Sequence, residues 1–89
     1  MAEIDVRHLG GESFEVTIDE HSSQSVHIVT ASAKHVELLC EGCEPEHLVA
    51  ASMRFLLDRE PKEAIMNQFD LDVIATYFPD YVSALPEYL

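Results

Sequence analysis

The clearest pattern of apolar and polar positions lies in residues 13–19, SFEVTID, where apolar side chains alternate with polar ones. A period of two places successive side chains on opposite faces of a strand. The same alternation in residues 3–8 predicts an earlier strand, and the Gly-Gly pair between the two runs predicts a two-residue turn. A polar loop over residues 20–24 is expected next, and residues 26–30 then alternate again and predict a third strand.

After these strands the spacing of apolar residues becomes helical. Val36, Leu39 and Cys40 fall at i, i+3 and i+4, and Ser32 is in position to cap the first turn. Gly42 follows, as glycine commonly does just past a helix. The spacing predicts a short helix over residues 32–40.

The largest group of apolar residues follows in a helix that is predicted to begin at Pro45 and to end before Pro61. Proline suits the first helical position, where its missing N–H has no partner to lose. At about 100° per residue, the apolar side chains fill a broad arc: Leu48, Val49, Met53, Phe55, Leu56 and Leu57. Arg54 and Asp58 lie on the opposite side and are expected to pair. An arc this wide predicts that the helix is covered from two directions.

Two or three shorter helices are expected in the C-terminal part of the chain. The first starts at Pro61 and runs to Phe69. Asp70 suits the N-cap of the second, over residues 71–77. A final short turn precedes residues 86–89, which are expected to form a tail.

These elements predict an α+β fold, in which a short antiparallel meander of two or three strands packs on a central helix. A chain of 89 residues forms one domain, residues 1–89, because it is too short for two cores. A domain of this size leaves much of its surface exposed, so association into a homodimer is also expected.

The charge balance is the strongest compositional feature: 17 acidic residues face 5 basic ones, a net charge of −12. Such a surface repels phosphate backbones and anionic membranes, so neither nucleic acid nor a membrane is an expected partner. The sequence has no apolar run of about 18 residues and no secretory signal, and a cytoplasmic location is expected. The charge suits solubility or a basic protein partner.

Two cysteines and two histidines form the sharpest candidate for chemistry: His35, Cys40, Cys43 and His47. Two thiolates and two imidazoles are a tetrahedral zinc set, although all four lie within one short segment. A buried Cys40 thiol, an adventitious disulfide and a redox pair are the alternatives. The pair follows a helix, whereas thioredoxin-like chemistry requires a helix N-terminus after a strand.

An aromatic group near the C-terminus has two interpretations: Tyr77, Phe78, Tyr81 and Tyr88. The four side chains can pack at the end of the helical layer, or they can form a patch that binds a partner. No nucleophile stands beside a patterned histidine and acid, and no Gly-rich phosphate loop is present, so an enzyme is not expected. The expected function is a non-catalytic protein-interaction domain. The alternatives are zinc binding and an acidic nucleic-acid mimic, which would require carboxylates on one face.

The run FLLDREPKEAIMNQFDLDVIATYFPDY, residues 55–81, resembles a pattern in small bacterial proteins of uncharacterised function. In those proteins a strand pair precedes a segment of the form FLLxREPxxxIxxxFDLxxIxxYFPxY. The resemblance covers the C-terminal half of the chain well and the strands loosely. It implies a shared shape for the helical layer and no particular activity.

Overall fold

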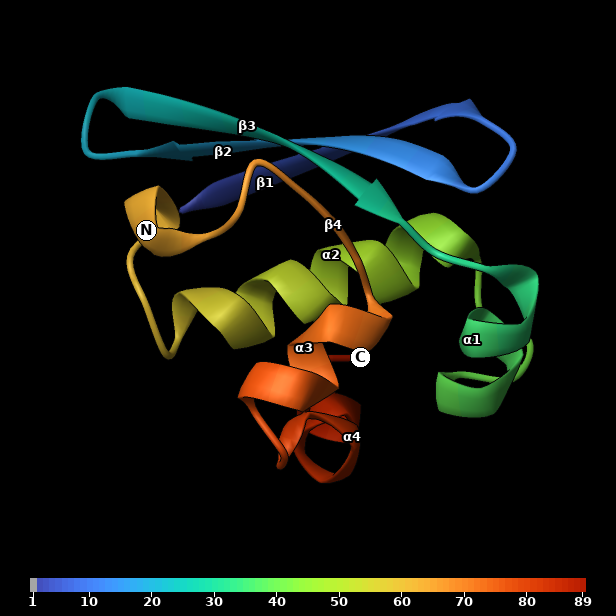
Figure 1. The fold of residues 1–89 in the computed structure, drawn as a ribbon. Coiled ribbons are helices and arrows are strands. Elements are labelled where there is room, and N and C mark those ends of the chain that lie inside the picture. The colour runs from blue at the N-terminus through green and yellow to red at the C-terminus, as the bar shows by residue number, and fades with distance from the viewer. Residues whose placement is uncertain (1) are drawn as a thin grey trace.

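A curved four-stranded sheet covers one side of a long helix, α2, and the C-terminal helices lie on the other side of it (Figure 1). The protein is described here by a computed structural model, which covers residues 2–89. The α+β class is therefore confirmed. The elements in chain order are β1 (Glu3–Gly10), β2 (Ser13–Glu20), β3 (Ser23–Thr30), α1 (Ala33–Leu39), α2 (Pro45–Leu57), the 3-10 helix η1 (Lys62–Ala64), β4 (Gln68–Asp70), α3 (Asp72–Tyr77), α4 (Tyr81–Ala84) and the 3-10 helix η2 (Leu85–Glu87).

The sheet has the order β1-β2-β3-β4, with the first three strands antiparallel and β4 parallel to β3. The helix expected from Pro61 to Phe69 is wrong, because this segment forms η1 and then enters β4. Phe69 and Leu71 both turn inward, with 7% and 0% of their surfaces exposed. The pairing also uses N–H and C=O groups on the far edge of β3 that would otherwise lack partners.

The turn between β2 and β3 is shorter than the polar loop expected over residues 20–24. His21 and Ser22 adopt positive φ values of 54° and 64°, so two residues suffice to reverse the chain. This turn sets the register of β3 and directs His27 and Val29 into the core, where they are 1% and 0% exposed. Val26 points outward in consequence and is 47% exposed.

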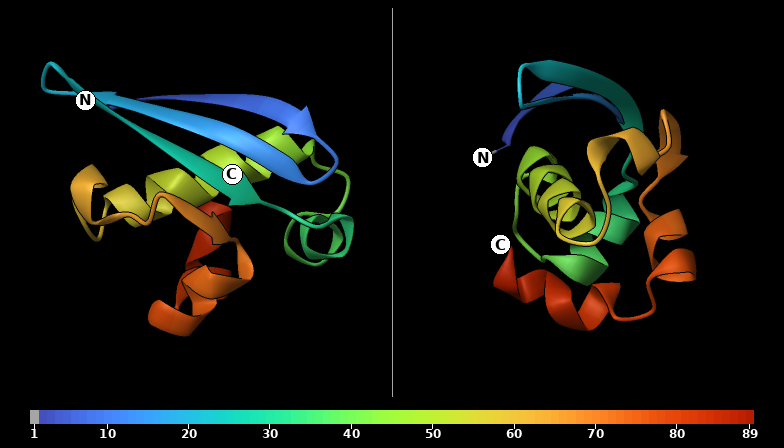
Figure 2. Two further views of the ribbon diagram at one scale, coloured as in Figure 1. Left: turned by 45° about the horizontal axis from the view of Figure 1, so that its top comes forward. Right: turned by 90° about the vertical axis from the view of Figure 1, so that its left-hand side faces the viewer.

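The two longer helices begin as the sequence predicts. The Ser32 hydroxyl accepts a hydrogen bond from the His35 N–H at 3.1 Å and caps α1, and Pro45 occupies the first turn of α2. The apolar arc of α2 is buried, and two further views of the ribbon show this helix between the sheet and the C-terminal helices (Figure 2). The expected pair of Arg54 and Asp58 is not among the ion pairs that residues 2–89 form. Asp58 accepts a hydrogen bond from the Tyr88 hydroxyl instead.

The C-terminal residues continue the helical layer, although residues 86–89 were expected to form a tail. They begin within η2, and the Tyr88 ring then packs edge-on against Phe55 at 5.8 Å between centroids. This contact of the half-buried ring, together with the buried Leu85 of η2, holds the segment on the helical layer. Among the helices of residues 2–89, none combines the length and hydropathy that a membrane span requires.

Candidate functional site

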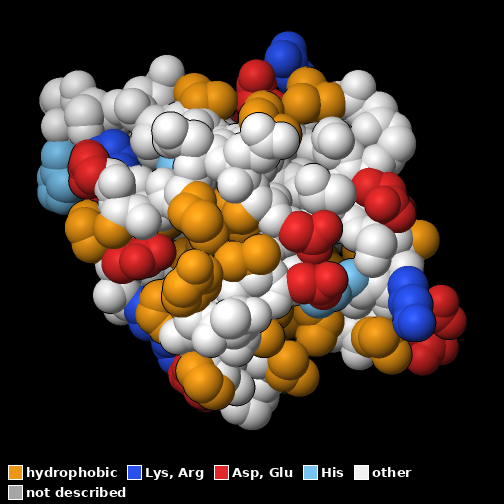
Figure 3. All heavy atoms as spheres, in the orientation of Figure 1, with side chains coloured by type: hydrophobic (Ala, Val, Ile, Leu, Met, Phe, Trp, Pro, Cys, Tyr) orange, Lys and Arg blue, Asp and Glu red, His pale blue; other side chains and the backbone are white. Residues whose placement is uncertain are grey.

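An apolar groove of about 360 Å³ opens where the end of α2, η1, β4 and α3 meet. In the orientation of Figure 1, its hydrophobic side chains form a patch near the centre of the molecule, with carboxylates on either side (Figure 3). Nine of its ten lining residues are apolar or aromatic. They are Leu56, Glu60, Ala64, Ile65, Met66, Phe69, Val73, Ile74, Tyr77 and Phe78.

The groove has a buried floor and an exposed rim. Ile65, Phe69 and Ile74 are 4%, 7% and 2% exposed, so these side chains are held in place by the core. Met66 and Tyr77 are 43% and 64% exposed and border the opening. Methionine adapts to irregular partners and tyrosine is a frequent interface anchor, so this rim is typical of a binding surface.

The position of Met66 depends on a buried histidine of the sheet. The Nδ1–H of His27 donates to the main-chain carbonyl of Met66 at 2.8 Å, and its Nε2 lies 2.9 Å from the Ser25 hydroxyl oxygen. Because the ring is almost fully buried, these two hydrogen bonds satisfy polar atoms that water does not reach. The imidazole therefore fixes the connector between η1 and β4 on the sheet, and with it one wall of the groove.

The surroundings of the groove are acidic. Between residues 58 and 80 the chain has six acidic residues and two basic ones. Glu60 lines the groove, and the side chains of Glu63 and Asp72, which are neighbours of lining residues, are 67% and 73% exposed. The groove therefore joins an apolar interior to a negatively charged border.

Both basic residues of this region already have carboxylate partners. Arg59 pairs with Asp80 and lies over the Phe55 ring, 3.8 Å from its centroid. The hydrogen bond to Asp80 raises the pKa of Arg59 above its ordinary value. Lys62 is 4% exposed and pairs with Glu63, which lowers the pKa of that carboxyl. Lys62 therefore offsets one carboxylate of the border, Glu63, and Arg59 offsets Asp80, but the six carboxylates of residues 58–80 remain in excess over these two cations.

The four aromatic residues predicted as a partner-binding patch do not share one surface. Tyr81 is fully buried and packs against the Phe55 ring at 5.2 Å between centroids, where Phe78 and Tyr88 also contact it. The patch interpretation is therefore wrong for Tyr81, whose ring packs in the core, while Phe78 and Tyr88 are only half-buried where they meet Phe55. Tyr77 and the half-buried Phe78 line the groove.

The buried Tyr81 ends a hydrogen-bonded chain on α2. Its hydroxyl lies 2.7 Å from the Ser52 hydroxyl, which itself donates to the Leu48 carbonyl at 2.8 Å. Because Ser52 uses its proton for Leu48, Tyr81 donates to Ser52. Burial raises the pKa of Tyr81 to about 12. This chain ties α4 to the central helix and lies away from the groove.

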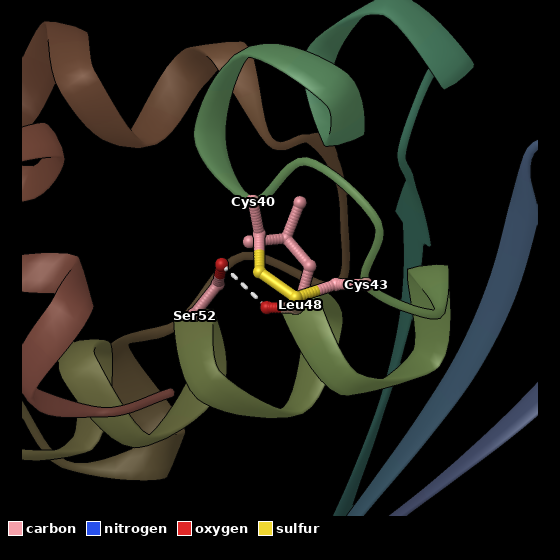
Figure 4. Close-up of a disulfide and its surroundings, with 4 residues drawn as sticks. All are labelled: Cys40, Cys43, Leu48 and Ser52. Carbon is pink, nitrogen blue, oxygen red and sulfur yellow. Dashed lines mark hydrogen bonds between the residues drawn. A yellow bond between two sulfur atoms is a disulfide. The ribbon is translucent and has the colours of Figure 1, made fainter.

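The structure does not bring the four predicted zinc ligands together. Cys40 and Cys43 form a disulfide that closes the turn between α1 and α2, beside Leu48 (Figure 4). His35 pairs through Nδ1 with Asp72, and His47 is exposed in the first turn of α2. Residues 2–89 contain no group of three or more His, Cys, Asp or Glu side chains placed to hold one metal ion.

The acidic residues are distributed over the whole fold. Carboxylates lie on β1 and β2, on α1 and α2, beside η1, and around α3 and α4. A nucleic-acid mimic would need them gathered on one rigid face, in the place of phosphates. This distribution offers that alternative no particular support.

The groove was not predicted from the sequence, although some of its residues gave a signal. Ile65, Phe69 and Ile74 fall within the C-terminal segments that were expected to be helical. The exposed Met66 directly beside the buried Ile65 is the local sign of a surface where apolar residues are not fully covered. In comparisons with known proteins, no family model, no curated protein and no solved structure matches the chain.

Proposed function

We propose that this protein is a non-catalytic interaction domain whose groove binds a short basic amphipathic helix of a partner protein. The observation that carries the proposal is the juxtaposition of the apolar lining with an acidic border. An amphipathic helix docks by placing apolar side chains at i, i+3 or i+4, and i+7 into a groove of this kind. Lysines or arginines on its flanks would then meet Glu60 and the exposed Asp72.

Charge favours this partner over an acidic or a neutral one. The chain carries a net charge of −12, and the two cations of residues 58–80, Arg59 and Lys62, are already paired. Opposite charge accelerates encounter and rejects partners of the wrong sign. A basic helix therefore fits both the long-range field of the domain and the local border of the groove.

The groove does not depend on the oxidation state of the cysteines. None of its lining residues is Cys40 or Cys43. We place the protein in the cytoplasm, where glutathione keeps most thiols reduced, and there the groove would persist without the disulfide. All lining residues fall within residues 55–81, and we propose that the bacterial proteins with the similar pattern share this groove.

The proposal can be tested with a synthetic helical peptide of about 14 residues, four turns, that carries leucines on one face and lysines on the other. A peptide of the same composition in scrambled order is the control for charge alone. We expect the amphipathic peptide to bind more tightly in fluorescence anisotropy, and to shift the NMR methyl signals of Ile65, Met66 and Ile74. Equal affinity for both peptides, or shifts elsewhere on the domain, would reject the groove.

Variants of the rim provide the matched comparison. Met66→Glu adds a charge at the opening and is expected to weaken peptide binding by about tenfold or more, because it buries a carboxylate against leucine. Val82→Glu makes a similar change at an exposed apolar residue of α4 outside the lining, and binding should be unaffected. Equal effects of both variants would show that the peptide responds to net charge and not to the groove.

A further inference from the structure

The outer edge of β1 is an eight-residue strand edge that no other strand of residues 2–89 covers. Figure 2 shows β1 at one border of the curved sheet, above α2. Its inward side chains Ile4 and Val6 are only half-buried, although they lie opposite the fully buried Ile18 and Val16 of β2. A long open edge with partly exposed apolar side chains favours pairing with another strand.

The turn between β2 and β3 establishes which backbone groups point to that edge. Glu20 pairs with Ser23 across two turn residues, both with positive φ, so Glu20 and Ser23 exchange both hydrogen bonds. Along β2, even-numbered residues then bond to β3 and odd-numbered residues to β1. The far side of β3 agrees, because Ile28 donates from there to the Asn67 carbonyl at 2.7 Å.

The same alternation continues into β1. Asp5 lies opposite Thr17, an odd-numbered residue of β2, so Asp5 directs its N–H and C=O groups toward β2. Ile4, Val6 and His8 therefore direct theirs to the free edge. A partner strand must present its own free groups at the same spacing of two residues.

We propose that two copies of this chain associate through antiparallel pairing of their β1 edges, with Val6 on the twofold axis. Val6 exchanges both hydrogen bonds with the partner's Val6, and Ile4 does so with the partner's His8. The odd-numbered residues alternate with these pairs on the outer face, so Asp5 faces the partner's Arg7 and Arg7 faces the partner's Asp5. The interface is isologous, as a twofold dimer requires.

Charge selects this register among those that can form the hydrogen bonds. A shift of the partner strand by one residue would place residues whose N–H and C=O groups point to the free edge opposite residues whose groups point to β2. The edge hydrogen bonds could not form, so this shift is excluded. The smallest allowed shift moves the partner strand by two residues. In one direction this shift places Asp5 opposite the partner's Asp5, and in the other direction it places Arg7 opposite the partner's Arg7. Only with Val6 on the axis are both charged positions matched with opposite charge.

The dimer would also extend a contact that the single chain already makes. Arg7 pairs with Glu15 of β2 at 3.1 Å, and the Arg7 side chain is 68% exposed. In the dimer, this guanidinium lies between Glu15 on one side and the partner's Asp5 on the other. One of only five basic residues in the chain would thus neutralise acids on both sides of the interface.

Reversing the charge at Asp5 and at Arg7 provides the test, and sedimentation and light scattering measure the dissociation of the dimer. In Asp5→Arg, two arginines face each other at both ends of the pairing, and in Arg7→Asp two aspartates do. Each variant alone should dissociate about 10- to 100-fold more readily than the wild type. In an equimolar mixture every facing pair is again of opposite charge, so a mixed dimer should form. The double variant Asp5→Arg/Arg7→Asp should dimerise by itself for the same reason.

Two controls carry the same changes of net charge away from the edge: Asp19→Arg on β2 and Lys34→Asp on α1. Both should dimerise like the wild type, and circular dichroism would show that each variant is folded. A wild-type chain that stays monomeric at every attainable concentration would overturn the proposal. So would a dimer whose stability is the same in the single variants and in their mixture, or a double variant that is folded but monomeric. The outcome does not depend on peptide binding, because the groove borders β4, at the opposite edge of the sheet.

Discussion

Replacement of Tyr81 by phenylalanine should change the stability of the protein in opposite directions at neutral and at alkaline pH. At neutral pH the variant loses one buried hydrogen bond, from Tyr81 to Ser52, while Ser52 keeps its bond to the Leu48 carbonyl. A hydrogen bond of this kind contributes about 1 kcal/mol to stability. We therefore expect Tyr81→Phe to be less stable than the wild type by about that amount.

The sign reverses because burial raises the pKa of Tyr81 from 10.0 to about 12. The folded protein holds the phenolic proton more tightly than the unfolded chain does. The associated stability is fully present below the unfolded pKa and is lost as the pH rises through the folded pKa. A difference of two pKa units corresponds to about 2.7 kcal/mol, of which roughly half is lost by pH 11.

These two magnitudes predict that the stability curves of the two proteins cross at roughly pH 10.5 to 11. Urea unfolding followed by circular dichroism, at one protein concentration and at a series of pH values, measures the difference. Groups that titrate in both proteins cancel in this comparison. Tyr77→Phe, at an exposed position, is the control for loss of a tyrosine. A stability difference that is constant up to about pH 11.5 would refute the assignment of Tyr81 as a buried donor.

Three further changes test the core and the turn. Phe55→Ala removes the ring on which three aromatic side chains pack, and it should lower the free energy of unfolding in urea by about 3–5 kcal/mol. A loss below about 1.5 kcal/mol would contradict the central place of this ring in the core. His27→Phe keeps an aromatic ring but leaves the Met66 carbonyl without its donor, which should cost about 1–3 kcal/mol and weaken peptide binding. The double variant C40S/C43S should lower stability by about 2 kcal/mol, since the disulfide closes only a short loop. Zinc added to the reduced wild type is expected to leave its thermal midpoint unchanged, and a rise that the double variant lacks would support the metal set.

The sequence predicts most of the central layer because apolar residues recur there at regular helical and strand spacing. The apolar arc of α2 contains Leu48, Phe55 and Leu56, and all three are at most 4% exposed. Pro45 and Ser32 mark helix starts through local chemistry alone, so no tertiary information is needed to place them. The strong alternation of apolar and polar residues in β2 is likewise a local pattern that needs no tertiary information.

The fourth strand could not be predicted in the same way. It has three residues, Gln68–Asp70, which is too short for a period of two to be distinguished from helical spacing. Phe69 and Leu71, two positions apart and both buried, were the available signal. The segment becomes a strand because β3 offers unpaired backbone groups, and this tertiary contact overrides the local preference.

Which tyrosines belong to the surface and which to the core was left open by the sequence for a related reason. Tyr77 and Tyr81 are four residues apart and would share a face of one continuous helix. The chain leaves α3 after Tyr77, passes Pro79, and begins α4 at Tyr81 with a new direction. One tyrosine is therefore at the rim of the groove and the other in the core. The groove itself also depends on the contact of His27 with Met66, 39 residues apart, which no local pattern reveals.

The two proposed surfaces can be separated by their response to salt. Binding of a basic peptide to the acidic groove joins opposite charges, so added salt should weaken it. Association of two chains, each with a net charge of −12, works against long-range repulsion. Salt screens this repulsion over distances beyond about 8–10 Å, while the proposed contacts of Asp5 with the partner's Arg7 are short. The dimer should therefore become tighter with salt over the same range in which the peptide dissociates, and parallel responses would show that one of the two surfaces is wrongly assigned.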